Sequence, residues 1–529
     1  MQKTTILHTI LFAIFPVLLI YSQNIHLLPI AEIIFPLFLI VGVSLIAWKI
    51  ITYFFDNKFK SGLLISLFLV LFFSYGHVYN LLVDISIFDF DIGRHRFLLI
   101  PFVISLVGAS IFIIKTSRKL NNLSSIVTVI SLTAVMILFV NVSMDIFQEN
   151  FLDSSLMSSE ENFLGTGASR TSEFELFYSQ KSLTDIPKNI QSSSKPDIYY
   201  IILDEYGSNH ALKNFFNHDN SSFTDSLLEK NFFIFEPSFT NYPTTVQSLG
   251  STLNMKYINY LSDQTTENSK NYNLLNDVLS KNEVMKILKQ NDYFIINMGA
   301  LWGPNNSFHF SDIDLCEFKE FNRDSLMREL LQITMLSYVQ ERLVEEGRRD
   351  RVLCLFEELP ELQKIPTNPK FVFAHVMLPH APYIFGPNGE SITPGNSLDG
   401  MPWEPRKAHV DQIKFANQKI NTLLNSILTY NTNSIIIIQG DTGSSFDGDW
   451  NSPSNELIIE RMSNLNAIYM PDNNYSSFEE TTTPVNTFRI IMNEIFDKNY
   501  EILPDMMYWS TTDLPYLHED VTHLLEDTL

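Results

Sequence analysis

The chain has 529 residues and a net charge of -23, yet its mean hydropathy is slightly positive at +0.05. It is too long for one ordinary domain, and its apolar and acidic residues must lie in different parts. Residues 1–145 carry nine Lys/Arg and six Asp/Glu, whereas the remainder carries 27 and 53. Because the acidic part would repel phosphate backbones, we expect no nucleic-acid partner.

The N-terminal part contains apolar stretches of about the length needed to cross a bilayer. No small-residue cleavage pattern follows the first stretch, so we interpret it as a retained span rather than a signal peptide. The sequence thus predicts a five-helix transmembrane domain over residues 1–145. Its spans are Thr5–Tyr21, Leu28–Ile50, Leu63–Val83, Phe97–Ile114 and Ile126–Val142.

The distribution of basic residues predicts the orientation of these spans. Lys49 lies at the end of the second span, and Lys58 and Lys60 lie in the loop after it. The loop after the fourth span holds three Lys/Arg, and the loop after the first span holds none. By the positive-inside rule the N-terminus is inside, and five crossings place everything after residue 145 outside. We therefore expect a multi-pass protein of the cytoplasmic (inner) membrane. Ionisable residues are few within the spans, with Glu32 the main exception, which argues against a transporter.

Residues 146–195 are rich in serine and predict a juxtamembrane linker. From residue 196 onwards, apolar runs of strand length alternate with helical patterns, which predicts an extracytoplasmic α/β domain (196–529) with a mainly parallel sheet. The expected strands are Phe232–Phe235, Tyr293–Asn297, Phe371–Val376 and Ser434–Ile438, in addition to the run that begins at Tyr199. The expected helices are Leu274–Gln290, Leu326–Glu346, 408–430 and Val485–Phe496.

Acidic residues follow two apolar runs. Tyr199–Gly207 reads YYIILDEYG and places Asp204 and Glu205 after a buried strand, and Asp441 and Thr442 follow the run at 435–438. Ligands of open α/β sheets bind beyond the carboxyl ends of strands. A metal or a phosphate-handling group is therefore expected at Asp204; the alternative is an acid that caps the next helix.

A threonine hydroxyl and a histidine also lie at the ends of predicted elements, as the two acids do. Thr245 opens a helix, where the positive end of the helix dipole favours an alkoxide, although an N-cap threonine is the commoner reason for such a residue. His380 lies in a proline-rich loop after a strand and could donate to a substrate oxyanion, although a lone loop histidine is usually a surface residue. Together, two acids, a hydroxyl and a histidine at one sheet edge form the set that a metal-activated hydroxyl nucleophile needs.

These motifs resemble the alkaline phosphatase superfamily, in its sulfatase-like branch. The resemblance covers 196 to about 500 and includes the stretches NYPTTVQSL, FAHVMLPHAPY and PVNTFRIIMN. Apolar spans followed by an outer catalytic domain are also similar to lipoteichoic acid synthases and phosphoethanolamine transferases. Those enzymes transfer a phospho-headgroup from a lipid through a covalent threonine intermediate.

The resemblance implies a role for each candidate residue. Thr245 would be the nucleophile and a metal ligand, and His380 would contact the substrate oxyanion. Ser248 stands at the place of the serine in the sulfatase nucleophile motif and would contact substrate. The carboxylate ligands of one divalent metal ion would be Asp204 and Asp441, with Glu205 and Thr442 as further ligands.

The sequence departs from the family pattern in two ways. The stretch after Thr245 lacks the proline and arginine that accompany formylglycine, which argues against ordinary sulfate-ester hydrolysis. Thr442 stands where the phosphotransferases have a metal-binding histidine. A threonine oxygen favours Mg²⁺, Mn²⁺ or Ca²⁺ over Zn²⁺, or it marks a site that has lost its metal.

The leading hypothesis is a membrane-bound, metal-dependent phosphotransferase, phosphodiesterase or sulfatase-like hydrolase. Its expected partners are membrane lipids, with a phospho-headgroup or an envelope glycan as substrate. The alternative is a catalytically degenerate domain that binds an envelope ligand or partner. Cys316 and Cys354 either form a disulfide or remain unpaired.

Overall fold

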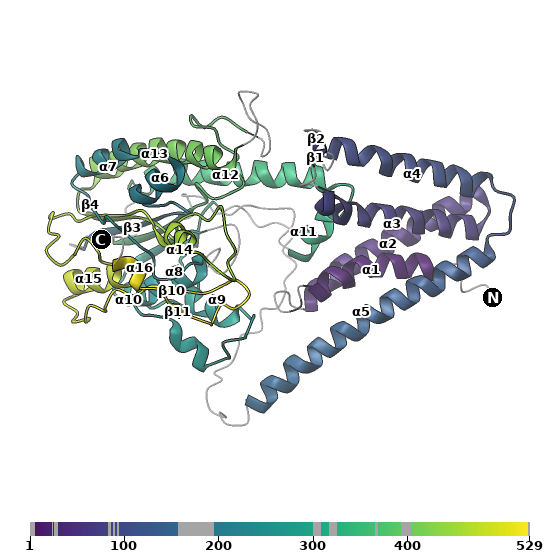
Figure 1. Cartoon of the computed structure of the whole chain (residues 1–529), viewed down its shortest axis with the longest axis horizontal. Helices are drawn as coiled ribbons and strands as arrows, with labels where there is room; N and C mark the ends of the chain where they lie inside the picture. Colours follow the sequence, from purple (N-terminus) through teal and green to yellow (C-terminus); the bar gives the residue numbers. More distant parts are fainter. Residues whose placement is uncertain are drawn as a thin grey trace. The chain divides into compact units, whose positions relative to one another are not determined.

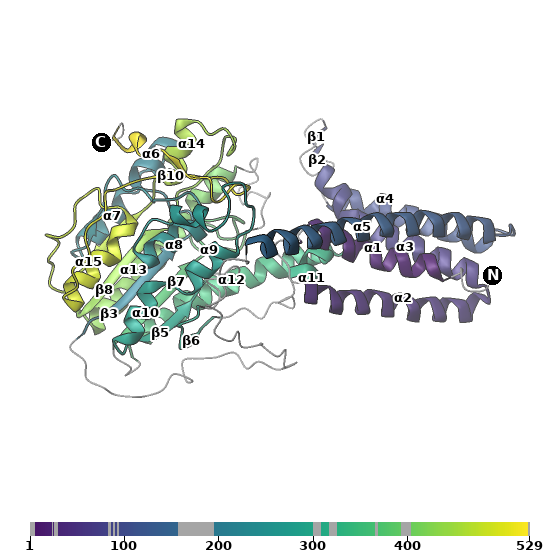
Figure 2. The ribbon, with the colours of Figure 1, turned by 90° about the horizontal axis from the view of Figure 1, so that it is seen from below.

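The computed structural model describes residues 6–23, 25, 30–82, 86–87, 90–91, 95–156, 195–299, 308–316, 325–364, 369–392 and 404–526 (Figures 1 and 2). The predicted linker 146–195 lies largely outside these residues. The chain divides into two compact units: Met1–Glu175 with Lys319–Val344, and Leu176–Phe318 with Glu345–Leu529. The segment Lys319–Val344 therefore belongs to the unit of the N-terminal helices, although in sequence it lies within the predicted outer domain.

The described part of each of the five predicted spans is largely helical. Four of the helices are long and apolar enough to cross a membrane, whereas α1 has 17 residues and contains Pro16. The number of crossings remains a prediction. The helices are α1 (Leu7–Gln23), α2 (Ile34–Phe55), α3 (Lys58–Leu82), α4 (His95–Lys115) and α5 (Asn121–Leu156), with the 3-10 turn η1 (Ile30–Ile33) and the short strands β1 (Ser86–Ile87) and β2 (Phe90–Asp91).

Buried polar groups join these apolar helices. His8 of α1 hydrogen-bonds through Nδ1 to the Ser66 hydroxyl of α3 at 2.7 Å and through Nε2 to the Ser124 hydroxyl of α5 at 3.0 Å. The neighbouring Thr9 hydroxyl donates to the Gly62 carbonyl of α3. Each group thereby gains a partner that the hydrocarbon core of a bilayer would not provide.

The helix α11 (Ser325–Gln332) packs Leu326 and Leu330 into the apolar core of the first unit. The turn that follows α11 bonds to the backbone of α3: the Gly76 N–H donates to the Ile333 carbonyl at 2.9 Å, and the Met335 N–H donates to the Phe72 carbonyl at 3.0 Å. A Cβ atom at position 76 would lie 2.4 Å from the Gln332 carbonyl oxygen, so this approach requires glycine. The next helix, α12 (Ser337–Leu362), begins in the first unit and ends in the second.

The second unit is built on a seven-stranded sheet in the order β4-β9-β8-β3-β7-β5-β6. The pairs among β8, β3, β7, β5 and β6 are parallel, and the pairs of β9 with β8 and β4 are antiparallel, so the predicted α/β fold with a mainly parallel sheet is confirmed. The strands are β3 (Asp197–Leu203), β4 (Phe233–Ile234), β5 (Phe294–Met298), β6 (Ile313–Asp314), β7 (Lys370–Val376), β8 (Ser434–Gly440) and β9 (Asn466–Tyr469).

The strand β3 lies near the middle of the sheet because both of its faces are apolar. Tyr199, Ile201 and Leu203 pack on one face with α6, α7, α12 and α13, whereas the residues between them pack on the other face with α8, α9, α10 and α15. A continuous apolar run is typical of a parallel strand covered on both sides. The helices are α6 (Asn209–Phe216), α7 (Ser221–Leu228), α8 (Thr245–Asn254), α9 (Asn273–Ser280), α10 (Glu283–Gln290), α13 (Pro405–Tyr430), α14 (Asn455–Met462) and α15 (Pro484–Phe496).

The unit ends with the two-stranded sheet of β10 (Tyr508–Trp509) and β11 (Glu519–Asp520), followed by α16 (His523–Glu526), and a 3-10 turn η4 spans Asn259–Asp263. The predicted single helix Leu274–Gln290 is two helices, α9 and α10. Asn282 separates them because its side chain accepts the Met285 N–H as an N-cap. Cys316 and Cys354, whose pairing the sequence left open, form a disulfide within this unit.

Candidate metal and nucleophile site

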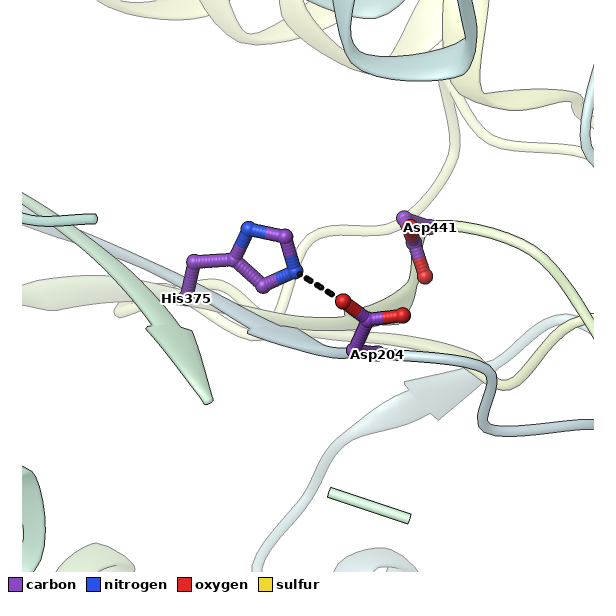
Figure 3. A group of neighbouring side chains, drawn as sticks. All are labelled: Asp204, His375 and Asp441. Carbon is purple, nitrogen blue, oxygen red and sulfur yellow. Dashed lines mark ion pairs between the residues drawn. The ribbon is translucent and has the colours of Figure 1, made fainter. Parts of the chain in front are cut away.

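Adjacent strands bring the two predicted acids together. Asp204 follows β3 and Asp441 follows β8, and these parallel strands pair with Leu203 opposite Gly440. On the other side of β3, Ile202 pairs with His375 of β7. Because carboxyl ends of parallel strands meet at one edge, Asp204, His375 and Asp441 converge there (Figure 3).

These three side chains form a buried cluster whose nearest ligand atoms all lie within 4.8 Å of one another. His375 Nε2 lies 3.1 Å from Asp204 Oδ2. Oδ1 of Asp204 is buried and accepts no hydrogen bond from any residue that the structure describes. Since a buried acceptor without a partner is costly, the cluster suits a bound cation.

The two carboxyl groups respond oppositely to their surroundings. Burial, followed by the negative charge of Asp204, raises the pKa of Asp441 to about 6. Burial also opposes ionisation of Asp204, but the positive charges of His380, His375 and Arg461 outweigh it and lower the pKa of Asp204. Two buried carboxylates beside an imidazole are the donor set of a divalent metal such as Mn²⁺ or Zn²⁺.

Thr245 lies at this cluster, at the first residue of α8. Its Oγ1 donates to Asp441 Oδ2 at 2.5 Å, and the other oxygen of Asp441 accepts the Glu205 backbone N–H at 3.0 Å. The Thr245 side chain is half-buried, so it can be reached from outside. The structure thus brings the predicted nucleophile to one of the predicted metal ligands.

Thr442 and Ser248 lie next to the cluster but in different settings. Thr442 is fully buried, and its Oγ1 has no hydrogen-bond partner among the described residues. The hydroxyl oxygen is therefore available to coordinate a cation. Ser248 is also buried, and its hydroxyl donates to the Asp441 carbonyl at 2.6 Å and lies 2.7 Å from Thr240 Oγ1. The Ser248 hydroxyl therefore stabilises the backbone of Asp441. That Ser248 contacts substrate is still a prediction.

Glu205 and His380 lie on the solvent side of the cluster. A carboxylate oxygen of Glu205 lies 2.6 Å from Arg461 Nη1 and 3.8 Å from His380 Nε2, so Glu205 is engaged by Arg461. The side chain of His380 is 34% exposed, and its backbone N–H donates to the Asp204 carbonyl at 3.1 Å. Burial lowers the pKa of His380, but the negative charges of Asp204 and Glu205 outweigh it and raise the pKa.

Sequence reasoning did not assign two residues of this site. His375 lies in the FAHVMLPHAPY stretch, and a histidine inside a buried apolar strand is the signal that could identify it. Arg461 lies far along the chain, 256 residues from its partner Glu205. No local sequence pattern distinguishes it from a surface arginine of a helix.

The fold and the buried cluster define an α/β protein with a candidate divalent-metal site and an adjacent hydroxyl. The chain belongs to the sulfatase family, because the sequence model of that family matches residues 196–513. This confirms the resemblance noted from the motifs. A search of the curated proteins found no match.

Similar solved structures include two kinds of protein. One is the C-terminal periplasmic domain of EcEptC from Escherichia coli in complex with Zn, with 13% identity over 63% of this chain and 94% of that chain and a TM-score of 0.41. Another is BT1596, a 2-O GAG sulfatase, with 11% identity over 60% and 78% of the two chains and a TM-score of 0.40. The periplasmic domain of phosphoethanolamine transferase EptC from Campylobacter jejuni has 10% identity over 59% and 92% and a TM-score of 0.36.

Proposed function

We propose that the protein is a membrane-anchored, metal-dependent phosphotransferase or phosphodiesterase in which Thr245 is the nucleophile. The observation that carries the proposal is the 2.5 Å hydrogen bond from Thr245 Oγ1 to Asp441, one of three clustered candidate ligands. A threonine hydroxyl is a weak nucleophile unless a neighbouring base or metal activates it. Asp441 supplies the base, and the cluster supplies the place for the metal.

The residues that would hold the cation are Asp204, His375 and Asp441, with the hydroxyls of Thr245 and Thr442 nearby. A divalent cation bound there would lower the pKa of a coordinated hydroxyl and offset negative charge on a transferring phosphoryl group. The set contains one imidazole, which suits Mn²⁺ or Zn²⁺, while Ca²⁺ prefers six to eight oxygen ligands.

In this mechanism the Thr245 oxygen attacks phosphorus as its proton passes to Asp441. The bond between phosphorus and the leaving oxygen breaks, and His380 donates a proton to that oxygen. The phospho-threonine that results is then attacked at phosphorus by water or by an acceptor hydroxyl, which releases Thr245. Water gives a phosphodiesterase, and an acceptor hydroxyl gives a transferase.

The proposed location is the outer side of the cytoplasmic membrane. The basic loops after the second and fourth spans support an inside N-terminus, and four helices meet the length and hydropathy of membrane spans. With the apolar helix α1 counted as a fifth crossing, the chain after residue 145 lies outside. A catalytic domain tethered in this way is suited to lipid headgroups or envelope glycans. We propose that the substrate is a phosphate ester of a lipid headgroup or of an envelope glycan.

The test uses the full-length protein in detergent, with bis-p-nitrophenyl phosphate as probe and metal content measured by mass spectrometry. We expect Thr245→Ala to lower turnover by at least about 10³-fold, because the nucleophile is lost. Thr244→Ala is the matched control, since the Thr244 hydroxyl donates to Gln247 and not to Asp441.

Asp204→Asn should remove the bound metal, whereas Thr244→Ala should retain it. Full turnover by Thr245→Ala would reject the mechanism. Absence of metal and of Thr245-dependent turnover in the wild-type protein would instead favour the noncatalytic binding domain.

A further inference from the structure

The side chain of Arg461 joins three segments of the candidate site. Arg461 lies in the last turn of α14 and is 7% exposed. Its Nε donates to the Pro243 carbonyl at 2.7 Å, and its Nη1 donates to the Gly443 carbonyl at 2.8 Å and to Glu205 Oε1 at 2.6 Å. A planar guanidinium can hold such acceptors in a fixed arrangement, which a lysine ammonium cannot do.

Each partner of Arg461 is within two residues of a proposed functional group. Pro243 lies two residues before the nucleophile Thr245, and Gly443 lies two residues after Asp441. Glu205 directly follows Asp204. Strand pairing already places the Asp204 and Asp441 segments side by side. Arg461 contacts both of them and also the segment before Thr245, so it can set the position of the nucleophile relative to the two acids.

The end of α14 is itself fixed against the site. The Gly443 N–H donates to the Arg461 carbonyl at 2.7 Å, so the backbone and the side chain of Arg461 both bind Gly443. A Cβ at Gly443 would lie 2.2 Å from the Glu460 carbonyl oxygen, which leaves no room for a larger residue. On the other side, the Thr240 N–H donates to the Met462 carbonyl at 2.7 Å, just before the nucleophile segment.

Glu205 connects Arg461 to the substrate side. Its backbone has φ of 61°, which turns the chain sharply after Asp204, and its carboxylate lies between Arg461 and His380. Its backbone N–H also donates to Asp441. The carboxylate therefore has a role in the site that does not require a metal.

We propose that Arg461 is the positioning residue of this site and that Glu205 is its partner rather than a metal ligand. This inference rests on the proposed function in calling Thr245 the nucleophile and in placing a metal at Asp204 and Asp441. The Arg461–Glu205 pair fixes the spacing of Thr245, Asp204 and Asp441, and it sets the place of His380 beside them. The resemblance had implied Glu205 as a further ligand, so the two readings of Glu205 differ in a measurable way.

The test measures Mn²⁺ binding and Mn²⁺ electron paramagnetic resonance spectra of full-length variants, beside kcat and KM. Arg461→Lys keeps the charge but cannot reach three acceptors. We expect the Kd for Mn²⁺ to rise about 10-fold and kcat to fall about 10²-fold with a smaller change in KM. The Mn²⁺ spectrum should broaden as the ligand geometry becomes less uniform.

Arg489→Lys is the matched control, because Arg489 also donates to two backbone carbonyls in this unit, those of Glu501 and Met255, away from the site. Its Mn²⁺ affinity and spectrum should match the wild type. Wild-type Mn²⁺ affinity, spectrum and kcat in Arg461→Lys would overturn the positioning role.

Glu205→Gln decides the second half of the proposal. The amide oxygen can still accept from Arg461, so we expect a Kd for Mn²⁺ within about 3-fold of the wild type, with a lower kcat. A loss of Mn²⁺ as large as that of Asp204→Asn would make Glu205 a ligand and overturn the inference. Because Mn²⁺ binding is read without turnover, these results are separate from the failure of Thr245 as nucleophile.

Discussion

Buried histidines in the two units show how a structural polar group differs from one in a candidate site. His8 in the helical unit uses both ring nitrogens, one on Ser66 and one on Ser124, and so ties α1 to α3 and α5. His375 in the sheet lies against Asp204, whose Oδ1 has no hydrogen-bond partner among the described residues. Asp441 adds a second carboxylate within reach.

The difference lies in the bonding capacity that remains. The cluster around His8 is complete without a ligand, so its effect is to hold helices together. The cluster around His375 buries two acids beside each other, which is unfavourable until a cation compensates them. In this pair of clusters, the acceptor without a partner beside a second buried acid distinguishes the candidate metal site from the structural histidine.

The largest expected effect in this comparison is that of His375→Ala on metal binding. Loss of the imidazole removes the only nitrogen donor of the candidate cluster, and the Kd for Mn²⁺ should rise at least about 100-fold. Isothermal titration of the full-length protein measures it. His8→Ala serves as the control and should leave the Kd unchanged; unchanged binding by His375→Ala would exclude His375 from the ligand set.

A third buried histidine should produce an intermediate effect that depends on pH. His409 stacks on Phe216 with ring centroids 4.9 Å apart, and burial, followed by the positive charges of His380 and Arg406, lowers its pKa to about 3. Between pH 6.5 and 3 the unfolded chain binds a proton that the folded chain does not, so stability falls as the pH falls.

His409→Phe removes this contribution. As the pH falls below 6.5, the free energy of unfolding should decrease less steeply in the variant than in the wild type. We expect the two slopes to differ by about 1 kcal/mol per pH unit. Thermal melting at pH 6.5, 5.5 and 4.5, followed by tryptophan fluorescence, measures the difference. His309→Phe, at an exposed position, is the control, and equal pH dependence in all three proteins would contradict a neutral, buried His409.

The smallest expected effect is that of His8→Leu on the helical unit. Leucine fills the space but leaves Ser66 and Ser124 to bond to backbone carbonyls of their own helices, so the loss should be about 1 kcal/mol. Unfolding in mixed micelles of increasing sodium dodecyl sulfate content measures it. A loss of metal affinity together with this change would show that the two clusters are coupled, against the separation argued above.

The sequence was sufficient for the fold class because its strongest signals are local. The apolar runs that became β3, β7 and β8 are continuous, β-branched or aromatic, and end in turn residues, and the polar residues at their ends mark the site. Asp204 and Asp441 are predicted in this way, and Thr245 is predicted from its position at the start of a helix. The structure brings the three together.

The rest of the site depends on contacts that no local pattern contains. His375 lies beside Asp204 because β7 pairs with β3. Glu205 and Arg461 are 256 residues apart in sequence and meet only in the folded chain. The excursion of Lys319–Val344 to the other unit is equally hidden, since Leu326 and Leu330 have the helical spacing of any amphipathic helix. The feature that accommodates this segment is Gly76 in α3, where a larger residue would clash with the backbone of Ile333.

The disulfide between Cys316 and Cys354 encloses this excursion, because one cysteine precedes Lys319 and the other follows Val344. A protease that cuts once between these cysteines would therefore leave a single covalent molecule, and two fragments would separate on a gel only after reduction. The same enclosure bears on expression of the outer part alone. Residues 196–529 would retain Leu326, Leu330 and Ile333 without the N-terminal helices whose residues share their apolar core, so this fragment would expose an apolar segment.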